Sequence, residues 1–152
     1  EEKRAKKIAK AIIETRKSSK INSTRDLAEL ILEIIPRRFN DKKHPATKTF
    51  QAIRIFINNE LEELEALLIF ISKQLKIGGR ACIISFHSLE DRMVKRFFRD
   101  HSRRDPKLSK LPNLPDESSF KIVSKALKPK ESEVTSNPRS RSATLRVIEK
   151  IK

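Results

Sequence analysis

The residues best suited to chemistry stand directly behind one short apolar run. Ser85, His87, Ser88, Glu90 and Asp91 follow that run within a few positions. Histidine can exchange a proton near neutral pH, and carboxylates accept hydrogen bonds from amines. As a functional residue, His87 would face a ligand at the end of the element that precedes it.

The same residues also have structural interpretations. His87 can cap the following helix or hold the turn by hydrogen bonds. Glu90 and Asp91 can complement the dipole of that helix from its first turn, and Asp91 can pair with an arginine. A Ser-His-Asp triad drawn from Ser85 or Ser88 is disfavoured, because residues so close in sequence rarely reach that geometry and no nucleophile elbow surrounds them. A hydrolase is therefore the least favoured class.

Two further groups of residues suit an anionic ligand. The loop Asn137–Ser142 combines Arg139 and Arg141 with serines, and arginine forks bind phosphate through paired hydrogen bonds. The alternative is an ordinary solvated loop. A weaker cluster consists of His44, Lys48 and Arg54. Arg54 lies off the apolar stripe of its predicted helix and suits a salt bridge as well as a contact to RNA.

Other kinds of site are excluded by composition. Gly78 and Gly79 are the only glycines, so no glycine-rich loop is available for a phosphate or a dinucleotide. One cysteine and three histidines do not make a structural zinc site. We therefore predict no cofactor-binding residue and no metal ligand in this chain. Cys82 lies within the apolar run and is expected to be a small buried hydrophobic residue.

A strand, a polar turn and a helix must position the first group of residues. Gly78-Gly79 ends the preceding helix, and Ala81 to Phe86 reads as a strand covered on both faces, as in a parallel sheet. Arg92 to Arg99 reads as a helix. This order is half of a βαβ unit, whose ligands bind beyond the carboxyl ends of the strands.

The upstream chain is predicted to be helical. Residues 1–17 and a second segment capped by Ser23 or Thr24 have apolar faces at helical spacing, and Pro36 ends the second helix. The loop 36–45 is a candidate domain boundary. Residues 47–76 carry one long apolar stripe, which Asn58-Asn59 divides into two helices.

The downstream chain is predicted to add two strands. His101 to Pro115 lacks periodicity and reads as a loop. Phe120 to Leu127 reads as a strand and Glu131 to Thr135 as one helical turn. Apolar and polar residues alternate over 143–147, as in a half-buried strand. The last two strands are joined without a long helix and should be antiparallel.

The charge of the chain points to a polyanionic partner. There are 35 Lys+Arg against 20 Asp+Glu, a formal net charge of +15, and the excess spares residues 44–76. Nucleic acid is the simplest such partner. No apolar run is long enough to span a membrane, and the basic first helix lacks the aromatic anchors of a membrane-surface helix. A single cysteine fits a reducing, cytoplasmic location.

Three motifs together resemble the MraW/RsmH-type family. These motifs are HPATKTFQAIRIFINNEL (44–61), GGRACIISFHSLEDRMVKRFF (78–98) and NPRSRSATLRV (137–147). Members of that family are S-adenosylmethionine-dependent methyltransferases that modify the exocyclic N4 amine of a cytosine in the decoding region of 16S rRNA. The resemblance covers nearly the whole chain. It implies an α/β fold, namely the C-terminal part of a Rossmann-like class I methyltransferase sheet plus part of an inserted helical domain.

Several assignments follow from this resemblance. Residues 1–43 would belong to the inserted, substrate-recognition domain and residues 44–152 to the C-terminal half of the methyltransferase domain. The family topology places residues 143–150 antiparallel between strands 80–86 and 120–127. His87 and Asp91 become the candidate catalytic residues. The candidate contacts to the rRNA of the small ribosomal subunit are Ser85, Ser88, Asn137, Arg139, Arg141, His44, Lys48 and Arg54.

The sequence also departs from the family pattern. The glycine-rich cofactor loop, the acidic ribose-binding position and the Asp-Leu-Gly segment of the family are absent. The chain therefore resembles a fragment that is inactive alone and does not bind S-adenosylmethionine. Its exposed half-sheet would promote self-association. The competing class is a non-enzymatic RNA- or ribosome-binding module, which the charge would equally support but which does not require the strand-turn-helix motif.

Overall fold

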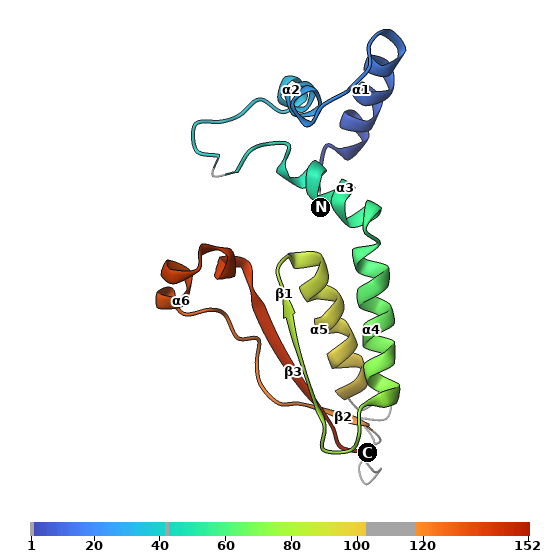
Figure 1. Ribbon diagram of the computed structural model, residues 1–152, viewed down its shortest axis with the longest axis vertical. Coiled ribbons are helices and arrows are strands. Elements are labelled where there is room, and N and C mark those ends of the chain that lie inside the picture. Colours follow the sequence, from blue (N-terminus) through green and yellow to red (C-terminus); the bar gives the residue numbers. More distant parts are fainter. Residues whose placement is uncertain (1, 42, 103–117) are drawn as a thin grey trace, which may run out of the picture. The chain divides into compact units, whose positions relative to one another are not determined.

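The computed structural model describes residues 2–41, 43–102 and 118–152. It contains two compact units, Glu1–Glu60 and Leu61–Lys152 (Figure 1). This boundary follows Asn58-Asn59, whereas the sequence favoured a boundary near residue 43. The two units are defined by contacts within this chain, so they do not test whether residues 1–43 belong to an inserted domain. That assignment stays a prediction.

The first unit begins with two helices, as predicted. They are α1 (Ala5–Ser18) and α2 (Thr24–Ile34). Ser23 caps α2: its hydroxyl accepts a hydrogen bond from the Asp26 N–H, and the Asp26 carboxylate accepts from the Ser23 N–H. The Ser23 hydroxyl also donates to the Asp26 carboxylate at 2.6 Å, and this hydrogen bond, ahead of those from the Asn22 and Ser23 N–H groups, lowers the pKa of Asp26. Ile8 and Ile31 of the two helices are buried together with Ala46.

The predicted long helical segment is divided at the expected place. Helix α3 (Thr47–Ile57) ends before Asn58, and α4 (Glu60–Gln74) begins after Asn59. Asn59 has φ +50°, the left-handed conformation that asparagine tolerates better than most residues. The two asparagines therefore form a helix break, and the prediction is confirmed.

The second unit is built on a three-stranded antiparallel sheet. Its strands are β1 (Arg80–Ser85), β2 (Phe120–Ile122) and β3 (Thr144–Lys150). Their order is β1-β3-β2, and both pairs are antiparallel (Figure 1). The predicted insertion of 143–150 between the other two strands is confirmed.

Two helices cover one face of this sheet. They are α4 and α5 (Ser88–Ser102). Their buried side chains pack with alternate residues of the strands in a core made of Leu68, Ala81, Ile83, Val94, Phe98, Phe120 and Ile148. Helix α5 extends beyond the predicted Arg92–Arg99 at both ends. At its N-terminal end, Glu90 and Asp91 are already part of the first turn, where acidic residues are favourable.

The prediction that the first strand is covered on both faces is wrong for the described chain. Burial alternates along β1, and the helices cover only the face that carries Ala81, Ile83 and Ser85. Cys82 is exposed instead of buried, and Ile84 is 56% exposed. An apolar run predicts that both faces of a strand are buried, but it does not show which segment of the protein covers each face.

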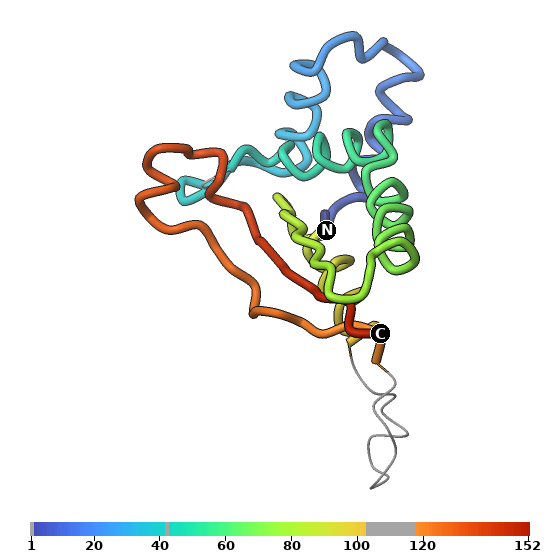
Figure 2. The backbone as a smooth tube through the Cα atoms, turned by 60° about the horizontal axis from the view of Figure 1, so that its bottom comes forward, coloured from blue at the N-terminus to red at the C-terminus, as the bar shows by residue number. Residues whose placement is uncertain are grey.

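The second predicted strand is shorter than expected. β2 ends at Ile122. Beyond it the Val123 N–H donates to the Val147 carbonyl, and the chain pairs with β3 again at the isolated bridge between Leu127 and Leu145. Figure 2 shows the segment after β2 running back along β3. It leads to α6 (Glu131–Ser136) and the 3-10 helix η1 (Pro138–Ser142). The predicted helical turn and the Asn-Pro turn are both present.

Two smaller predictions concern the segments that follow α5 and α4. His101 and Ser102, expected in a loop, are the last residues of α5, and the rest of the predicted loop to Pro115 lies outside the described residues. Gly78 has φ +78°, but α4 already ends at Gln74, so Gly78 belongs to the turn before β1 and does not end the helix as predicted. In the part of the chain described here, no helix has the length and apolarity required to cross a membrane.

Candidate functional site

The turn after β1 is held by a reciprocal set of hydrogen bonds. The Glu90 carboxylate accepts from the N–H groups of Phe86 (2.8 Å) and His87 (3.2 Å). In return, Nδ1 of His87 accepts from the Glu90 N–H at 3.3 Å. His87 Nε2 also lies 3.4 Å from Glu90 Oε1, and the His87 side chain is 10% exposed. The capping interpretation of His87 is confirmed, and its ring is fixed at the carboxyl end of β1.

Asp91 is paired with an arginine from the last strand. Nε and Nη2 of Arg146 donate to the two carboxylate oxygens of Asp91 at 2.8 and 3.0 Å. These hydrogen bonds, more than any other interaction, lower the pKa of Asp91, against an opposing contribution from burial. A carboxylate held in this way is a weak base at neutral pH. The expected pairing of Asp91 with an arginine is confirmed.

Two buried polar residues, Ser85 and Thr144, lie at the end of the sheet where β1 ends and β3 begins. Ser85 is 2% exposed and faces Thr144 across the β1-β3 register. Thr144 Oγ1 accepts a hydrogen bond from Lys128 Nζ. Within the described residues the Ser85 hydroxyl has no hydrogen-bond partner. A buried hydroxyl without a partner costs free energy, so Ser85 is available to a group that the described chain does not provide.

Sequence reasoning missed the residues that organise this end of the sheet, namely Arg146, Thr144 and Lys128. A signal for Arg146 was present, because strand alternation places it on the buried face between Thr144 and Ile148. A charge on such a face requires a partner of opposite sign, and the acids of the first α5 turn were the available ones. Lys128 carries no comparable signal, because it lies outside the regular elements.

The segment of Asn137–Ser142 presents its two arginines outward. The Asn137 side chain accepts from the Arg139 N–H at 3.2 Å, and the Ser140 hydroxyl donates to the Asn137 carbonyl at 2.8 Å. Ser140 is buried, whereas Arg139 and Arg141 are exposed. Neither arginine forms an ion pair with any described residue, so bracing by Glu131 or Glu133 is not observed. The geometry suits contact with an external anion.

The third predicted cluster belongs to the first unit and is held by local contacts. His44 Nδ1 accepts from the Ala46 N–H at 3.2 Å, directly before α3. Arg54 forms two hydrogen bonds with Glu60, at 2.7 and 2.9 Å, so the salt-bridge interpretation of Arg54 is confirmed. Lys48 is exposed on the first turn of α3. The structure brings Ser85, His87, Ser88 and Asp91 together in the second unit, while His44, Lys48 and Arg54 belong to the first unit.

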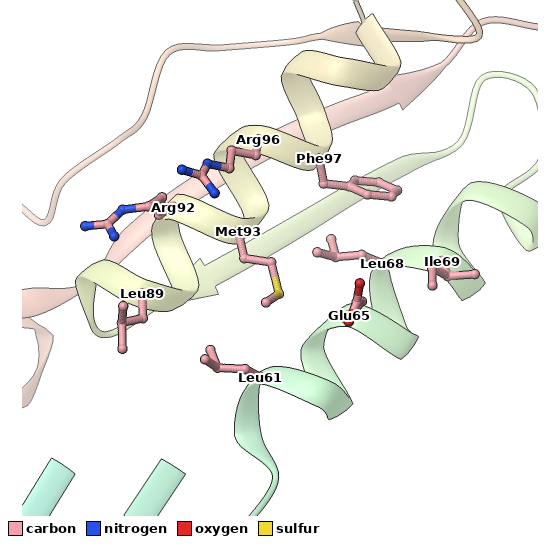
Figure 3. Close-up of a pocket in the computed structure, with 9 residues that line it drawn as sticks. All are labelled: Leu61, Glu65, Leu68, Ile69, Leu89, Arg92, Met93, Arg96 and Phe97. Carbon is pink, nitrogen blue, oxygen red and sulfur yellow. The ribbon is translucent and has the colours of Figure 1, made fainter. Parts of the chain in front are cut away.

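A groove between α4 and α5 involves none of the predicted site residues. It has a volume of about 390 Å³, and Leu61, Leu68 and Met93 point into it from the two helices (Figure 3). Arg92 and Arg96 also belong to the lining, although their guanidinium groups point away from α4, and Glu65 contributes from α4 (Figure 3). The lining is mainly apolar and contains no nucleophile, so it is not a reaction centre on its own.

The two glycines do not form a cofactor loop. The Gly78 N–H donates to the Lys150 carbonyl, which joins the turn before β1 to the end of β3. A Cβ at Gly79 would lie 2.8 Å from the Lys76 carbonyl, so Gly79 is required for close backbone packing. Both glycines precede β1 and neither follows a strand end. These residues do not fit the phosphate- or methionine-binding loop of a nucleotide-type cofactor.

Comparison with known proteins defines the class of this α/β chain. A family model described as the MraW methylase family matches residues 1–151. The ribosomal RNA small subunit methyltransferase H of Coxiella burnetii (strain RSA 493 / Nine Mile phase I) is 46% identical over 153 residues, which cover 99% of this chain and 49% of that protein. The same-named protein of Nitrosococcus oceani is 47% identical, with 99% and 48% covered.

The family match extends over all but the last residue of the chain and includes both units. The chain therefore belongs to the MraW methylase family. It spans about half the length of the curated relatives that it matches, and it corresponds to their C-terminal part. The resemblance inferred from the three motifs is confirmed.

Proposed function

We propose that this chain is the C-terminal part of an enzyme that transfers a methyl group from S-adenosylmethionine to the exocyclic N4 of a cytosine in the decoding region of 16S rRNA. The observation that carries the proposal is the identity of 46% to an rRNA small subunit methyltransferase across nearly all of the chain. The N4 position and the decoding region rest on the motif resemblance. A substrate in the small ribosomal subunit implies a cytoplasmic location.

In this proposal the sheet is the C-terminal part of a larger Rossmann-like sheet. The free edge of β1 and its uncovered face support the idea, because Ile84 and Phe86 are 56% and 54% exposed. Strand edges and apolar faces of this kind are normally covered in folded proteins. The upstream half of the complete protein would provide that cover. Residues 1–43 would belong to the inserted domain, and residues 44–152 to the methyltransferase domain.

The chemistry requires orientation of a weak nucleophile. The lone pair of a cytosine amine is delocalised into the ring, so hydrogen-bond acceptors must hold the amine and positioning supplies much of the rate. S-adenosylmethionine would supply the methyl group when bound by the complete enzyme. His87, fixed by Glu90, would hold or relay a proton at the carboxyl end of β1. Asp91 would orient the same turn through Arg146.

The remaining predicted residues would bind the RNA. Arg139 and Arg141 suit phosphate contacts, because both are exposed on a turn that is already held by Asn137 and Ser140. Ser85 and Ser88 lie at the end of β1, where the target base would enter after extrusion from the RNA. His44, Lys48 and Arg54 would contribute from the first unit.

The experiment is methylation of small ribosomal subunits by the complete protein, followed by nuclease digestion and mass spectrometry of the nucleosides. The proposal predicts N4-methylcytidine at one position of the 16S rRNA. A methyl group on another base or on another atom of cytosine would contradict it. A non-enzymatic RNA-binding module is the alternative function, because the described chain is strongly basic. That alternative predicts binding to the subunits without any transfer.

A further inference from the structure

An arginine-lined cavity lies in the first unit, where α2 ends. Its volume is about 410 Å³, and its lining consists of Arg4, Ile35, Pro36, Arg37, Arg38 and Asp41. Three guanidinium groups and one carboxylate give this lining a formal charge of +2. Apart from Arg4, the lining residues come from the end of α2 and the loop that follows it, and the path of this loop is shown in Figure 1. None of them is a residue of the candidate functional site. Its composition favours an anionic ligand.

The backbone around this cavity is held by specific hydrogen bonds. Nη1 of Arg4 donates to the Ile34 carbonyl at 2.9 Å, so the end of α2 fixes the Arg4 side chain. The Asp41 carboxylate accepts from the Arg38 N–H at 2.8 Å, and the Asp41 N–H donates to the Arg38 carbonyl at 3.0 Å. Asp41 thus closes the loop. The side chains of Arg37 and Arg38 form no hydrogen bond or ion pair with any other described residue.

An aromatic side chain extends from the same loop. Phe39 is fully exposed, with a relative accessibility of 105%. A phenylalanine gains nothing from full exposure to water, and neighbouring arginines do not shield it. Exposed aromatic rings beside arginines are the usual platform for unpaired nucleotides: the ring stacks on a base, and the guanidinium groups contact the phosphates.

We propose that this loop binds a single-stranded segment of RNA, with a phosphate in the cavity of Arg4, Arg37 and Arg38 and a base stacked on Phe39. This inference rests on the proposed function, which supplies RNA as the substrate, and adds the recognition of unpaired nucleotides by the first unit. It differs from the role of Arg139 and Arg141, because the segment Asn137–Ser142 contains no aromatic residue and its arginines suit contacts to the RNA backbone.

The test uses the complete enzyme and two probes, a short oligo(U) RNA and an RNA duplex of the same length. Binding is measured by fluorescence anisotropy at several salt concentrations. The wild-type protein should prefer oligo(U). Arg37→Ala/Arg38→Ala should reduce the salt slope for oligo(U) by about 1.4, since each phosphate contact to a single strand contributes about 0.7. Phe39→Ala should weaken oligo(U) binding by roughly tenfold, the effect of losing one stacked base.

Matched variants separate this site from general charge and hydrophobicity. Lys10→Ala/Lys20→Ala removes two exposed charges from the same unit and should change the salt slope by less than half as much. Ile13→Ala removes an apolar side chain that is 60% exposed and should not change binding. Phe39→Tyr should retain the affinity, whereas Phe39→Leu should lose it, because leucine preserves apolar area but not the ring.

Several results would overturn the inference. Equal affinity of the wild-type protein for oligo(U) and duplex would do so, and so would equal losses in the arginine and lysine variants. Retention of affinity by Phe39→Leu would show that Phe39 serves apolar packing within the complete protein. These results leave methyl transfer by the wild-type enzyme untouched. Conversely, a protein that binds oligo(U) through Phe39 but methylates no cytosine would contradict the proposed function and not this site.

Discussion

At the scale of single residues, the ion pair of Asp91 and Arg146 links the turn after β1 to the start of β3. Its two hydrogen bonds are 2.8 and 3.0 Å long, and the side chains are 27% and 17% exposed respectively. A paired and partly buried arginine fixes both its own strand and the helix that carries its partner. This geometry favours a positioning role for Asp91 over direct proton transfer.

We expect Asp91→Asn and Arg146→Met to destabilise the complete enzyme by amounts that are not additive. Removal of either partner breaks the same contact, so a double-mutant cycle of unfolding free energies should give a coupling of about 1 kcal/mol. The pair Arg80–Glu149 joins the same two strands, but its arginine is 62% exposed, and its coupling should be about 0.5 kcal/mol or less. Equal coupling free energies in the two pairs would contradict the positioning role of the Asp91–Arg146 pair.

The acid dependence of stability provides a second prediction for Asp91. Hydrogen bonds from Arg146 lower the pKa of this carboxyl in the folded state. Such a group stabilises the protein above its ordinary pKa, and the contribution is lost as the pH falls through the lowered pKa. The unfolding temperature of the wild-type enzyme should therefore fall more on acidification than that of Asp91→Asn. If Asp91 is instead the general base, Asp91→Asn should lose the acid limb of the pH–rate profile.

Arg139 and Arg141 allow a prediction about RNA affinity. Replacement of both by alanine in the complete enzyme should weaken RNA binding and reduce its salt slope by roughly one unit per lost contact. Stability should change by no more than about 0.5 kcal/mol, because both side chains are solvated. Calorimetric affinity for S-adenosylmethionine should be unchanged. A loss of thermal stability with an unchanged salt slope would identify the arginines as structural.

At the scale of secondary structure, β1 is covered on one face and open on the other. Ala81 and Ile83 contact α4 and α5, whereas Cys82 and Ile84 are exposed. Opposite them on β3 lie Val147 and Leu145, so the open face is apolar across two strands. Such a surface associates with other apolar surfaces when nothing covers it.

We therefore expect the isolated chain to self-associate and the complete enzyme to do so much less. Sedimentation of both proteins at matched concentrations measures this directly. Ile84→Lys should reduce association of the isolated chain, because a charge on the open face opposes its burial. Lys121→Ala, at an exposed position of β2, is a suitable control. A monodisperse monomer of the unmodified chain with one sharp thermal transition would contradict the prediction.

Much of this arrangement was predictable from the sequence, and the failures have physical causes. Helical periodicity and Ser23, Pro36 and Asn58-Asn59 indicated the helices, because caps and breaks are local interactions. The strand order came from the family resemblance, which includes long-range information. The burial of Cys82 was predicted wrongly, because an apolar pattern does not reveal what covers each face. Lys128 was missed, because its contact with Thr144 depends on the path of an irregular segment.

At the scale of the whole molecule, the chain contains two compact units and about half the length of its relatives. The described residues contain no glycine-rich loop after a strand, and both glycines serve the turn before β1. We therefore expect no appreciable binding of S-adenosylmethionine by this chain alone. Isothermal titration calorimetry tests this, with the complete enzyme as the positive control. Micromolar affinity of the isolated chain would show that the cofactor contacts lie within residues 1–152.

The central position of β3 has a consequence for how the second unit is made. β1 and β2 each pair with β3 and not with each other, and β3 is the last of the three strands in the sequence. During synthesis, β1 therefore cannot pair until β3 has been made, because Arg80 lies opposite Glu149 in the register. Contacts so distant in sequence close slowly. The nascent chain must remain unaggregated with an incomplete sheet until β3 has left the ribosome, so chaperone demand should be greatest just before that point.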